Sequence, residues 1–192
     1  FRLLFKNAGT LLSGNMIAWI LGLITFAITA RILGPTQFGI FVLITTYVTI
    51  VDKILNFQSW QALIKYGAEV LEKKNNDSFK SIVKFCTLLD VATAVLGTIV
   101  SIMAASWVGQ WLSWESETVL MAAIYSFVIL FNIRGTPTGI LRLFNRFRLF
   151  AVQNIVTATI KFVGILIIYF TGASLWFVLI LWMITTILGQ LL

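Results

Sequence analysis

The chain has 192 residues, of which 59% are hydrophobic and only 11% are charged, and it carries a formal net charge of +7. A soluble domain carries about 25% charged residues, so this composition excludes a soluble globular protein and predicts an integral membrane protein. Nucleic-acid binding would need a basic stripe on a soluble fold, whereas the basic residues here cluster between apolar runs. We therefore expect a lipid bilayer and no nucleic acid as partner.

Several catalytic chemistries are excluded by residue type. The chain has no histidine and a single cysteine, Cys86, which lies in an apolar run and is expected to pack there. A Cys/His zinc site and a histidine-based triad are therefore ruled out. There is also no Walker motif and no dinucleotide fingerprint. The sequence predicts a protein that is not an enzyme and has no cofactor or metal.

Six apolar segments approach the roughly 20 residues that a membrane-spanning helix needs. They are Leu11–Ile32, Phe38–Asn56, Ser81–Trp107, Thr118–Arg134, Phe150–Phe170 and Leu175–Leu192. We expect Gly135 and Pro137 to break the fourth helix in "RGTPTG". The predicted fold is all-α, with about six transmembrane helices in one bundle. Because the chain starts at Phe1 and stops inside an apolar run, we interpret residues 1–192 as a fragment of a longer protein.

The connections between these segments differ in charge. Lysine and arginine occur before the first span, between the second and third, and between the fourth and fifth. The other connections, "LGPTQ", "VGQWLSWESE" and "TGAS", contain neither. Cytoplasmic loops carry an excess of both residues, so the pattern predicts a multi-pass protein with a cytoplasmic N-terminus.

Residues 57–80 form the longest basic connection and have an amphipathic pattern. Phe57, Trp60, Ile64 and Leu71 recur near helical spacing, and several lysines supply the polar side. We expect an amphipathic helix on the cytoplasmic leaflet, where each lysine adds about 1 kcal/mol of attraction to anionic lipid. A solvated linker helix is the alternative.

Polar and small residues form stripes along four of the spans at spacings of three or four. The stripes are Asn15, Ala18, Gly22, Thr25 and Thr29; Thr45, Thr49, Asp52 and Asn56; Thr87, Asp90, Ala94, Gly97 and Ser101; and Asn154, Thr157, Lys161 and Gly164. Close helix packing also produces such stripes and suffices for the first one. A charge at the bilayer centre, however, costs about 2.5–3.5 kcal/mol. Asp90 and Lys161 therefore favour a water-filled cavity.

The candidate cavity residues are Arg31, Arg134, Lys161, Asp90 and Asp52. Alternatives stay open for three of them: an interfacial anchor for Arg31, a buried ion pair with a basic neighbour for Asp90, and direct contact with water for Asp52. The excess of charge is positive, and arginine and lysine are the natural partners of phosphate. The pattern therefore predicts an anionic ligand.

Three motifs resemble those of bacterial polysaccharide-repeat-unit flippases. The chain contains "ARILGPTQFGIF" between the first two spans, "WQALIKYGAE" after the second, and "GILRLFNRFRLFAVQN" before the fifth. They are similar, in order and spacing, to segments of the Wzx-like O-antigen and capsule exporters of the MOP (multidrug/oligosaccharidyl-lipid/polysaccharide) superfamily. The resemblance implies two pseudo-symmetric six-helix bundles around a central cavity, of which residues 1–192 form the first.

The same resemblance implies a function in the bacterial inner membrane. An undecaprenyl-diphosphate-linked oligosaccharide, such as an O-antigen unit of lipopolysaccharide, would move between leaflets by alternating access, with polysaccharide polymerase and other assembly proteins as partners. Arg31, Arg134 and Lys161 would meet the diphosphate or acidic sugars. Coupling to a proton or sodium gradient stays open. The rivals are a drug or cation antiporter, which should favour acidic residues, and a glycan polymerase or ligase, which should carry a large outer loop.

Overall fold

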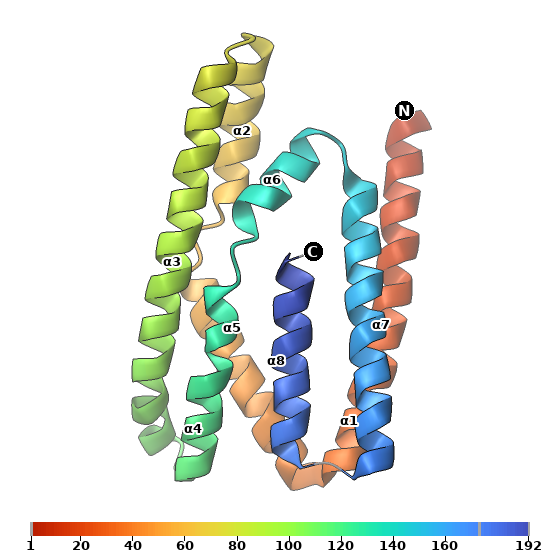
Figure 1. The fold of residues 1–192 in the computed structure, drawn as a ribbon, viewed down its shortest axis with the longest axis vertical. Helices are drawn as coiled ribbons and strands as arrows, with labels where there is room; N and C mark the ends of the chain where they lie inside the picture. Colours follow the sequence, from red (N-terminus) through yellow and green to blue (C-terminus); the bar gives the residue numbers. More distant parts are fainter. Residues whose placement is uncertain (1, 173, 192) are drawn as a thin grey trace.

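The computed structural model describes residues 2–172 and 174–191, and it describes side chains in these ranges except those of residues 2–15, 147 and 191. Within the described ranges every regular element is a helix, which confirms the all-α prediction. The helices are α1 (Arg2–Leu55), α2 (Ser59–Glu72), α3 (Asn76–Trp111), α4 (Ser116–Tyr125), α5 (Phe127–Leu130), α6 (Gly135–Leu143), α7 (Phe147–Thr171) and α8 (Leu175–Leu191) (Figure 1).

Helix α1 consists of two arms that meet at a sharp turn. Gly34 has φ 69° and ψ 175°, a conformation that glycine adopts without steric penalty. Pro35 follows and cannot donate a backbone hydrogen bond to the preceding turn. The two arms, residues 2–33 and 35–55, therefore form separate crossings, as predicted for the first two spans, and they diverge from the turn (Figure 1).

Apolar length supports the membrane assignment. Among the described residues, four helical stretches are long and apolar enough to cross a bilayer: Met16–Glu72, Asn76–Trp111, Ser116–Leu143 and Arg148–Thr171. A shorter apolar helix covers Leu175–Gln190. The stretch Met16–Glu72 contains the later part of the first arm of α1 and the whole second arm. The six predicted segments thus fall on the two arms of α1, on α3, on α4 with α5, on α7 and on α8.

The break after the fourth segment differs from the expectation. The helix stops at Leu130, and Gly135 and Pro137 belong to the first turn of α6, so these residues begin a helix where we expected them to end one. Proline is well tolerated in a first turn, because the amide hydrogen it lacks would have no partner there. Arg134 precedes this turn as the N-cap residue.

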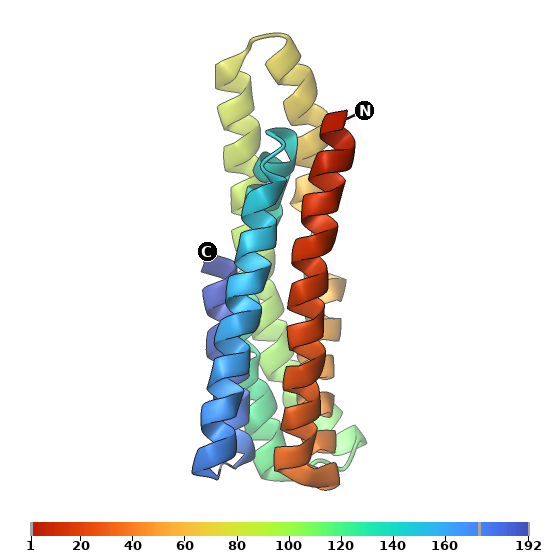
Figure 2. The ribbon, with the colours of Figure 1, turned by 90° about the vertical axis from the view of Figure 1, so that its right-hand side faces the viewer.

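Helices α2 and α3 form a hairpin that projects beyond the other helices at the end where the N-terminus lies (Figures 1 and 2). The side chain of Asn75 caps α3 by accepting a hydrogen bond of 3.1 Å from the Ser78 amide. Helix α3 has 36 residues, or about 54 Å, against a hydrocarbon thickness of about 30 Å. The helix is therefore longer than the apolar layer is thick.

The amphipathic helix expected in residues 57–80 exists as α2, but its buried face is a different one. Ser59, Leu63 and Gly67 are the buried residues, whereas Phe57 is 63% exposed. Leu63 packs closely against Gly139 of α6. Helix α2 runs along α3 (Figure 1) and does not cross the bundle end, as a helix lying flat on the leaflet would.

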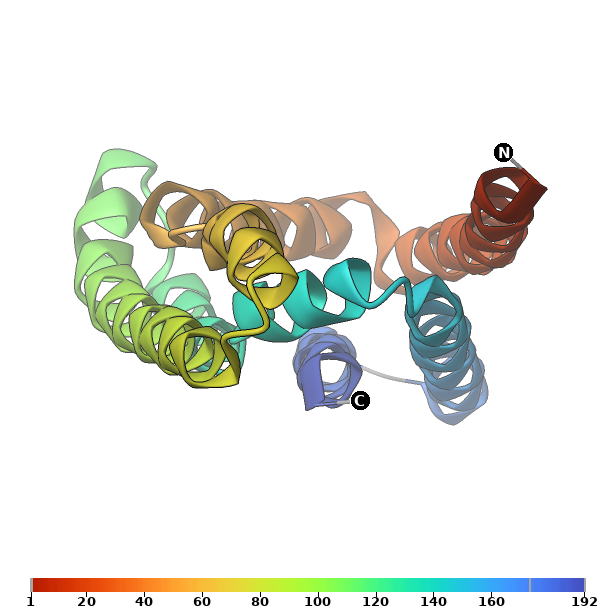
Figure 3. The ribbon, with the colours of Figure 1, turned by 90° about the horizontal axis from the view of Figure 1, so that it is seen from above.

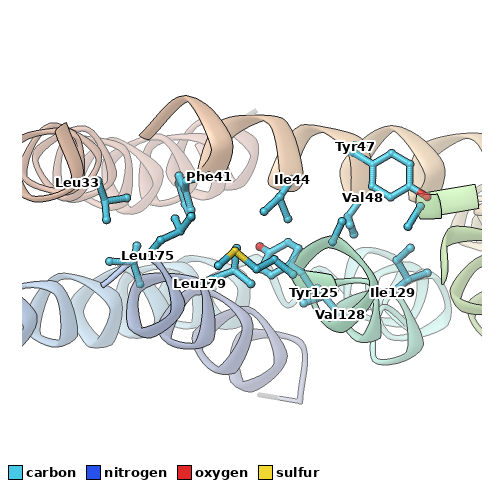
Figure 4. Close-up of a cluster of buried hydrophobic side chains, with 14 of the residues drawn as sticks. Leu33, Phe41, Ile44, Tyr47, Val48, Tyr125, Val128, Ile129, Leu175 and Leu179 are labelled. Atoms are coloured by element: carbon cyan, nitrogen blue, oxygen red, sulfur yellow. The ribbon is translucent and has the colours of Figure 1, made fainter. Parts of the chain in front are cut away.

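The apolar core joins the second arm of α1 to α4, α5 and α8. Phe41, Ile44 and Val48 face Ile129 and Leu179 across this contact (Figure 4). Seen from above, α7 and the first arm of α1 stand on one side, α3 and α4 on the other, and α8 between them (Figure 3). The space between α7, the arms of α1 and α8 is where three of the four polar stripes meet, those of the two arms of α1 and of α7.

Candidate functional site

Two neighbouring cavities lie among these helices. The larger has a volume of about 380 Å³ and is lined by Ala18, Trp19, Gly22 and Thr25 of α1, Asn154, Thr157, Ala158 and Lys161 of α7, and Arg134 and Thr186. Three members of the first predicted stripe and three of the fourth therefore line one cavity. Asn15 belongs to the first stripe too, but its side chain lies outside the described ones.

The second cavity has a volume of about 280 Å³ and lies on the other side of Lys161. Its polar lining residues are Thr45, Thr49 and Asp52 of α1, Tyr125, Asn132, Thr186 and Gln190. Lys161 and Thr186 line both cavities. The two spaces therefore adjoin at these residues, and five of the six predicted spans contribute polar side chains to them.

Lys161 occupies the centre of this arrangement. It lies roughly 15 Å along α7 from the helix end at Thr171, near the middle of an apolar layer of about 30 Å. Its ammonium nitrogen is 4.7 Å from the centroid of the Trp182 ring, a cation–π contact. Among the described side chains Lys161 makes no ion pair. Its charge is therefore available to a ligand in either cavity.

Arg134 lines the larger cavity near the C-terminal end of α8. Its guanidinium donates to the carbonyl oxygen of Gly189, which also accepts a hydrogen bond of 2.5 Å from the Gln153 amide. Its Nε atom is buried and has no hydrogen-bond partner in the described part of the chain. Arg134 therefore keeps one guanidinium donor without a partner among the described residues.

Asp52 lies at the wall of the second cavity, near the end of α1. One carboxylate oxygen accepts a hydrogen bond of 2.6 Å from the Asn132 amide, in the non-helical segment between α5 and α6. Asp52 is half-buried, and Lys53 beside it is exposed. Of the five predicted residues, Arg134, Lys161 and Asp52 line the two cavities.

Asp90 lies elsewhere. It is 5% exposed and accepts three hydrogen bonds, from the Ser59 hydroxyl and from the amide and hydroxyl of Thr136. It lines neither cavity, and no basic side chain is among these hydrogen-bond partners, so neither the cavity wall nor the buried ion pair describes its position. Asp90 is also about 30 Å along α3 from Trp111, at the edge of the apolar layer and not at its centre.

Arg31 lies on the exposed surface beside the α1 turn and lines neither cavity. The structure thus places it where an interfacial anchor would lie. Sequence patterns also missed several lining residues, among them Asn132, Trp182, Thr186 and Gln190. Only Asn132 had a usable signal, because it is a polar residue at a helix break; the others lie on α8, which has no continuous polar stripe.

Comparison with known proteins identifies the family. Residues 4–192 match the family described as "Polysaccharide biosynthesis protein". This chain belongs to the polysaccharide biosynthesis protein family. It is also 28% identical over 170 residues to "Inner membrane protein YghQ" of Escherichia coli (strain K12), which covers 88% of the chain. The chain spans about half (48%) of the length of that relative. No solved structure gives a significant match.

For a polysaccharide biosynthesis protein, the membrane location of the cavities is informative. Polar side chains line both cavities, and among the described side chains Lys161 and Arg134 make no ion pair there. The family match covers all the helices that line this space. The resemblance of the three sequence motifs to this group of membrane proteins is thereby confirmed at the level of the family.

Proposed function

We propose that the chain is the first bundle of a flippase that moves an undecaprenyl-diphosphate-linked oligosaccharide from the inner to the outer leaflet by alternating access. In this proposal the protein resides in the bacterial inner membrane, and the N-terminus and the α2–α3 turn face the cytoplasm. The remaining half of the cavity comes from a second bundle. O-antigen or capsule repeat units are the substrates.

One observation carries the proposal. Lys161 and Arg134 are held in a polar cavity inside a membrane bundle, and among the described side chains neither is neutralised by a carboxylate. An unpaired charge in the apolar layer is expensive and persists only for a function. A diphosphate supplies the matching negative charge, because its oxygens accept hydrogen bonds from both guanidinium and ammonium groups.

The positions of the two cations suggest how a diphosphate would travel. Arg134 lies near the end of the bundle that carries the N-terminus, whereas Lys161 lies about halfway across. A headgroup that enters beside Arg134 would reach Lys161 next, while its lipid tail stays in the bilayer. The polar stripes of α1 and α7 would solvate the sugars along this path.

The test is replacement of the cavity cations in the full-length protein. We expect Lys161→Ala and Arg134→Ala each to lower surface polysaccharide about tenfold or more, because each removes a charge that binds the diphosphate. Lys53→Ala is the matched control, since Lys53 is basic but exposed outside the lining of both cavities. Lipid-linked oligosaccharide should accumulate on the inner side in the two cavity variants only. Normal export by both would contradict the proposal.

A further inference from the structure

Asp90 joins three helices at one point. Its Oδ1 atom accepts a hydrogen bond of 2.5 Å from the hydroxyl of Ser59, at the start of α2. Its Oδ2 atom accepts from the amide and the hydroxyl of Thr136, at 2.7 and 2.8 Å, in the first turn of α6. One turn earlier on α3, the Cys86 thiol contacts the Ser59 carbonyl oxygen at 3.9 Å. Two helix starts are therefore fixed to α3.

Each feature of this junction suits a carboxylate that acts as an acceptor. Thr136 presents an amide at a helix N-terminus, where the backbone dipole favours negative charge and the amide has no partner within its own helix. A Cβ atom on Gly135 would overlap Ser59 Oγ and lie 2.6 and 2.9 Å from the two carboxylate oxygens of Asp90. The three helices thus approach as closely as glycine permits.

This junction lies directly beside a cavity residue. Arg134 is the N-cap residue of α6, one residue before Gly135 and two before Thr136. The hydrogen bond from the Thr136 amide to the Asp90 carboxylate fixes the start of α6 against α3. The side chain of Arg134 extends toward Gly189 and the larger cavity. The segment before it, between α5 and α6, has no regular secondary structure that would set the direction of Arg134.

We propose that Asp90 is a positioning residue: by holding Thr136 and Ser59 on α3, it directs Arg134 into the cavity. Asp90 itself does not touch the transported molecule. This inference rests on the proposed flippase function, in which Arg134 binds the diphosphate. In this role the Asp90 carboxylate acts as a hydrogen-bond acceptor outside the cavity, and its negative charge is not required.

The first test separates acceptor from charge. Asp90→Ala removes both acceptor oxygens and with them three hydrogen bonds, and it is expected to lower polysaccharide export about tenfold, as the loss of a buried network does. Asp90→Asn keeps an oxygen that can accept from Thr136 and presents an amide that can donate to Ser59 Oγ, so export should stay within about threefold of the original protein. If Asp90→Asn is as inactive as Asp90→Ala, Asp90 acts through its charge and the inference is wrong.

The second test asks whether Asp90 acts through Arg134. In the full-length protein, export by Asp90→Ala/Arg134→Ala should equal that of Arg134→Ala alone within about twofold, because the residue being positioned is already gone. Tyr47→Phe is the control. It removes a buried hydrogen bond from the Tyr47 hydroxyl to the Ser101 carbonyl, and its effect should multiply with that of Arg134→Ala. Effects of Asp90→Ala that multiply in the same way would overturn the inference.

A third measurement does not depend on export or on the stability of Asp90→Ala. Arg134→Cys is labelled in membranes with a negatively charged methanethiosulfonate, in a Cys86→Ala background, with Thr136→Val or Thr136→Ser added. We expect Thr136→Val, which lacks the hydroxyl, to change the labelling rate at least about threefold, and Thr136→Ser to leave it unchanged. Ala18→Cys, which lines the same cavity from α1, should label at one rate throughout. Equal rates at position 134 in all backgrounds would contradict the proposal.

The outcomes also separate this inference from the proposed function. Normal export by both Arg134→Ala and Lys161→Ala would refute the flippase cavity, whatever Asp90 does to the position of residue 134. Reduced export by Arg134→Ala, combined with an independent effect of Asp90→Ala, would refute the positioning role and leave the cavity in place.

Discussion

Helices α3 and α7 carry similar polar stripes, each with one charged residue, and the two stripes face different surroundings. Asn154, Thr157 and Lys161 of α7 line a cavity. On α3, Asp90, Gly97 and Ser101 are buried against neighbouring helices. Ser101 bonds to Ser126 of α4–α5, and Ile129 lies 3.0 Å from where a Cβ on Gly97 would be. Periodicity shows that a helix face is polar, but not whether water or protein covers it.

The same contrast separates the glycines. Nothing lies within 4 Å of a Cβ built on Gly22 in the cavity stripe of α1, whereas Gly164, one turn beyond Lys161 on α7, already meets Leu181 of α8. The cavity therefore ends within one turn of Lys161 on that helix. Substitutions that distinguish packed positions from cavity positions test this comparison directly.

The largest effect is expected at the point of closest approach. Gly135→Ala should destabilise the purified protein by about 3 kcal/mol, because the new methyl group overlaps Ser59 and Asp90. Gly22→Ala is the matched control and should change stability by less than about 0.5 kcal/mol, since its methyl group enters open space. Thermal unfolding in detergent measures both. Equal unfolding temperatures would mean that the junction is not packed as described.

The two charged residues of the stripes should differ nearly as much. Asp90→Ala leaves the buried donors of Ser59 and Thr136 without an acceptor and should lower stability by about 2–3 kcal/mol. Lys161→Met keeps the length of the side chain and loses only the contact of its charge with Trp182, so we expect a change of no more than about 1 kcal/mol. Thermal unfolding again measures both. A larger loss for Lys161→Met would show that this lysine is structural.

Hydroxyl groups offer a finer comparison. Ser126→Ala removes a 2.7 Å bond to Ser101 between buried side chains and should cost about 0.5–1.5 kcal/mol. Thr49→Val changes a cavity-lining hydroxyl that donates to the Thr45 carbonyl of its own helix, so stability should stay within about 0.5 kcal/mol. Denaturation of the two variants side by side measures the difference. A loss confined to Thr49→Val would reverse the assignment of packed and open faces.

The smallest effect is expected at Arg31. Its exposed position outside both cavities predicts that Arg31→Ala leaves polysaccharide export within about twofold of the original protein. The flippase resemblance would instead give Arg31 a share in ligand binding. Export measured at equal protein levels in the membrane decides between these expectations. A tenfold loss would return Arg31 to the transport path.

By itself, the sequence determined the membrane class, the positions of the helices and the polar character of their faces. These properties depend on local composition and on spacing along the chain, which is why the second arm of α1, α7 and α8 were predicted within a few residues, whereas the first arm begins nine residues before the predicted span. Lys161 and Arg134, which the sequence singled out because a charge in an apolar span or at a helix break has few alternatives, both line the larger cavity.

Only the tertiary structure decided which polar face is covered. Asp90 is buried because α2 and α6 both begin against α3, a meeting of segments 31 and 46 residues away in sequence. The buried face of α2 was likewise set by α3 and α6 and not by its own apolar periodicity. Such contacts depend on where helices from distant parts of the chain come to lie, and no spacing within one segment encodes that position.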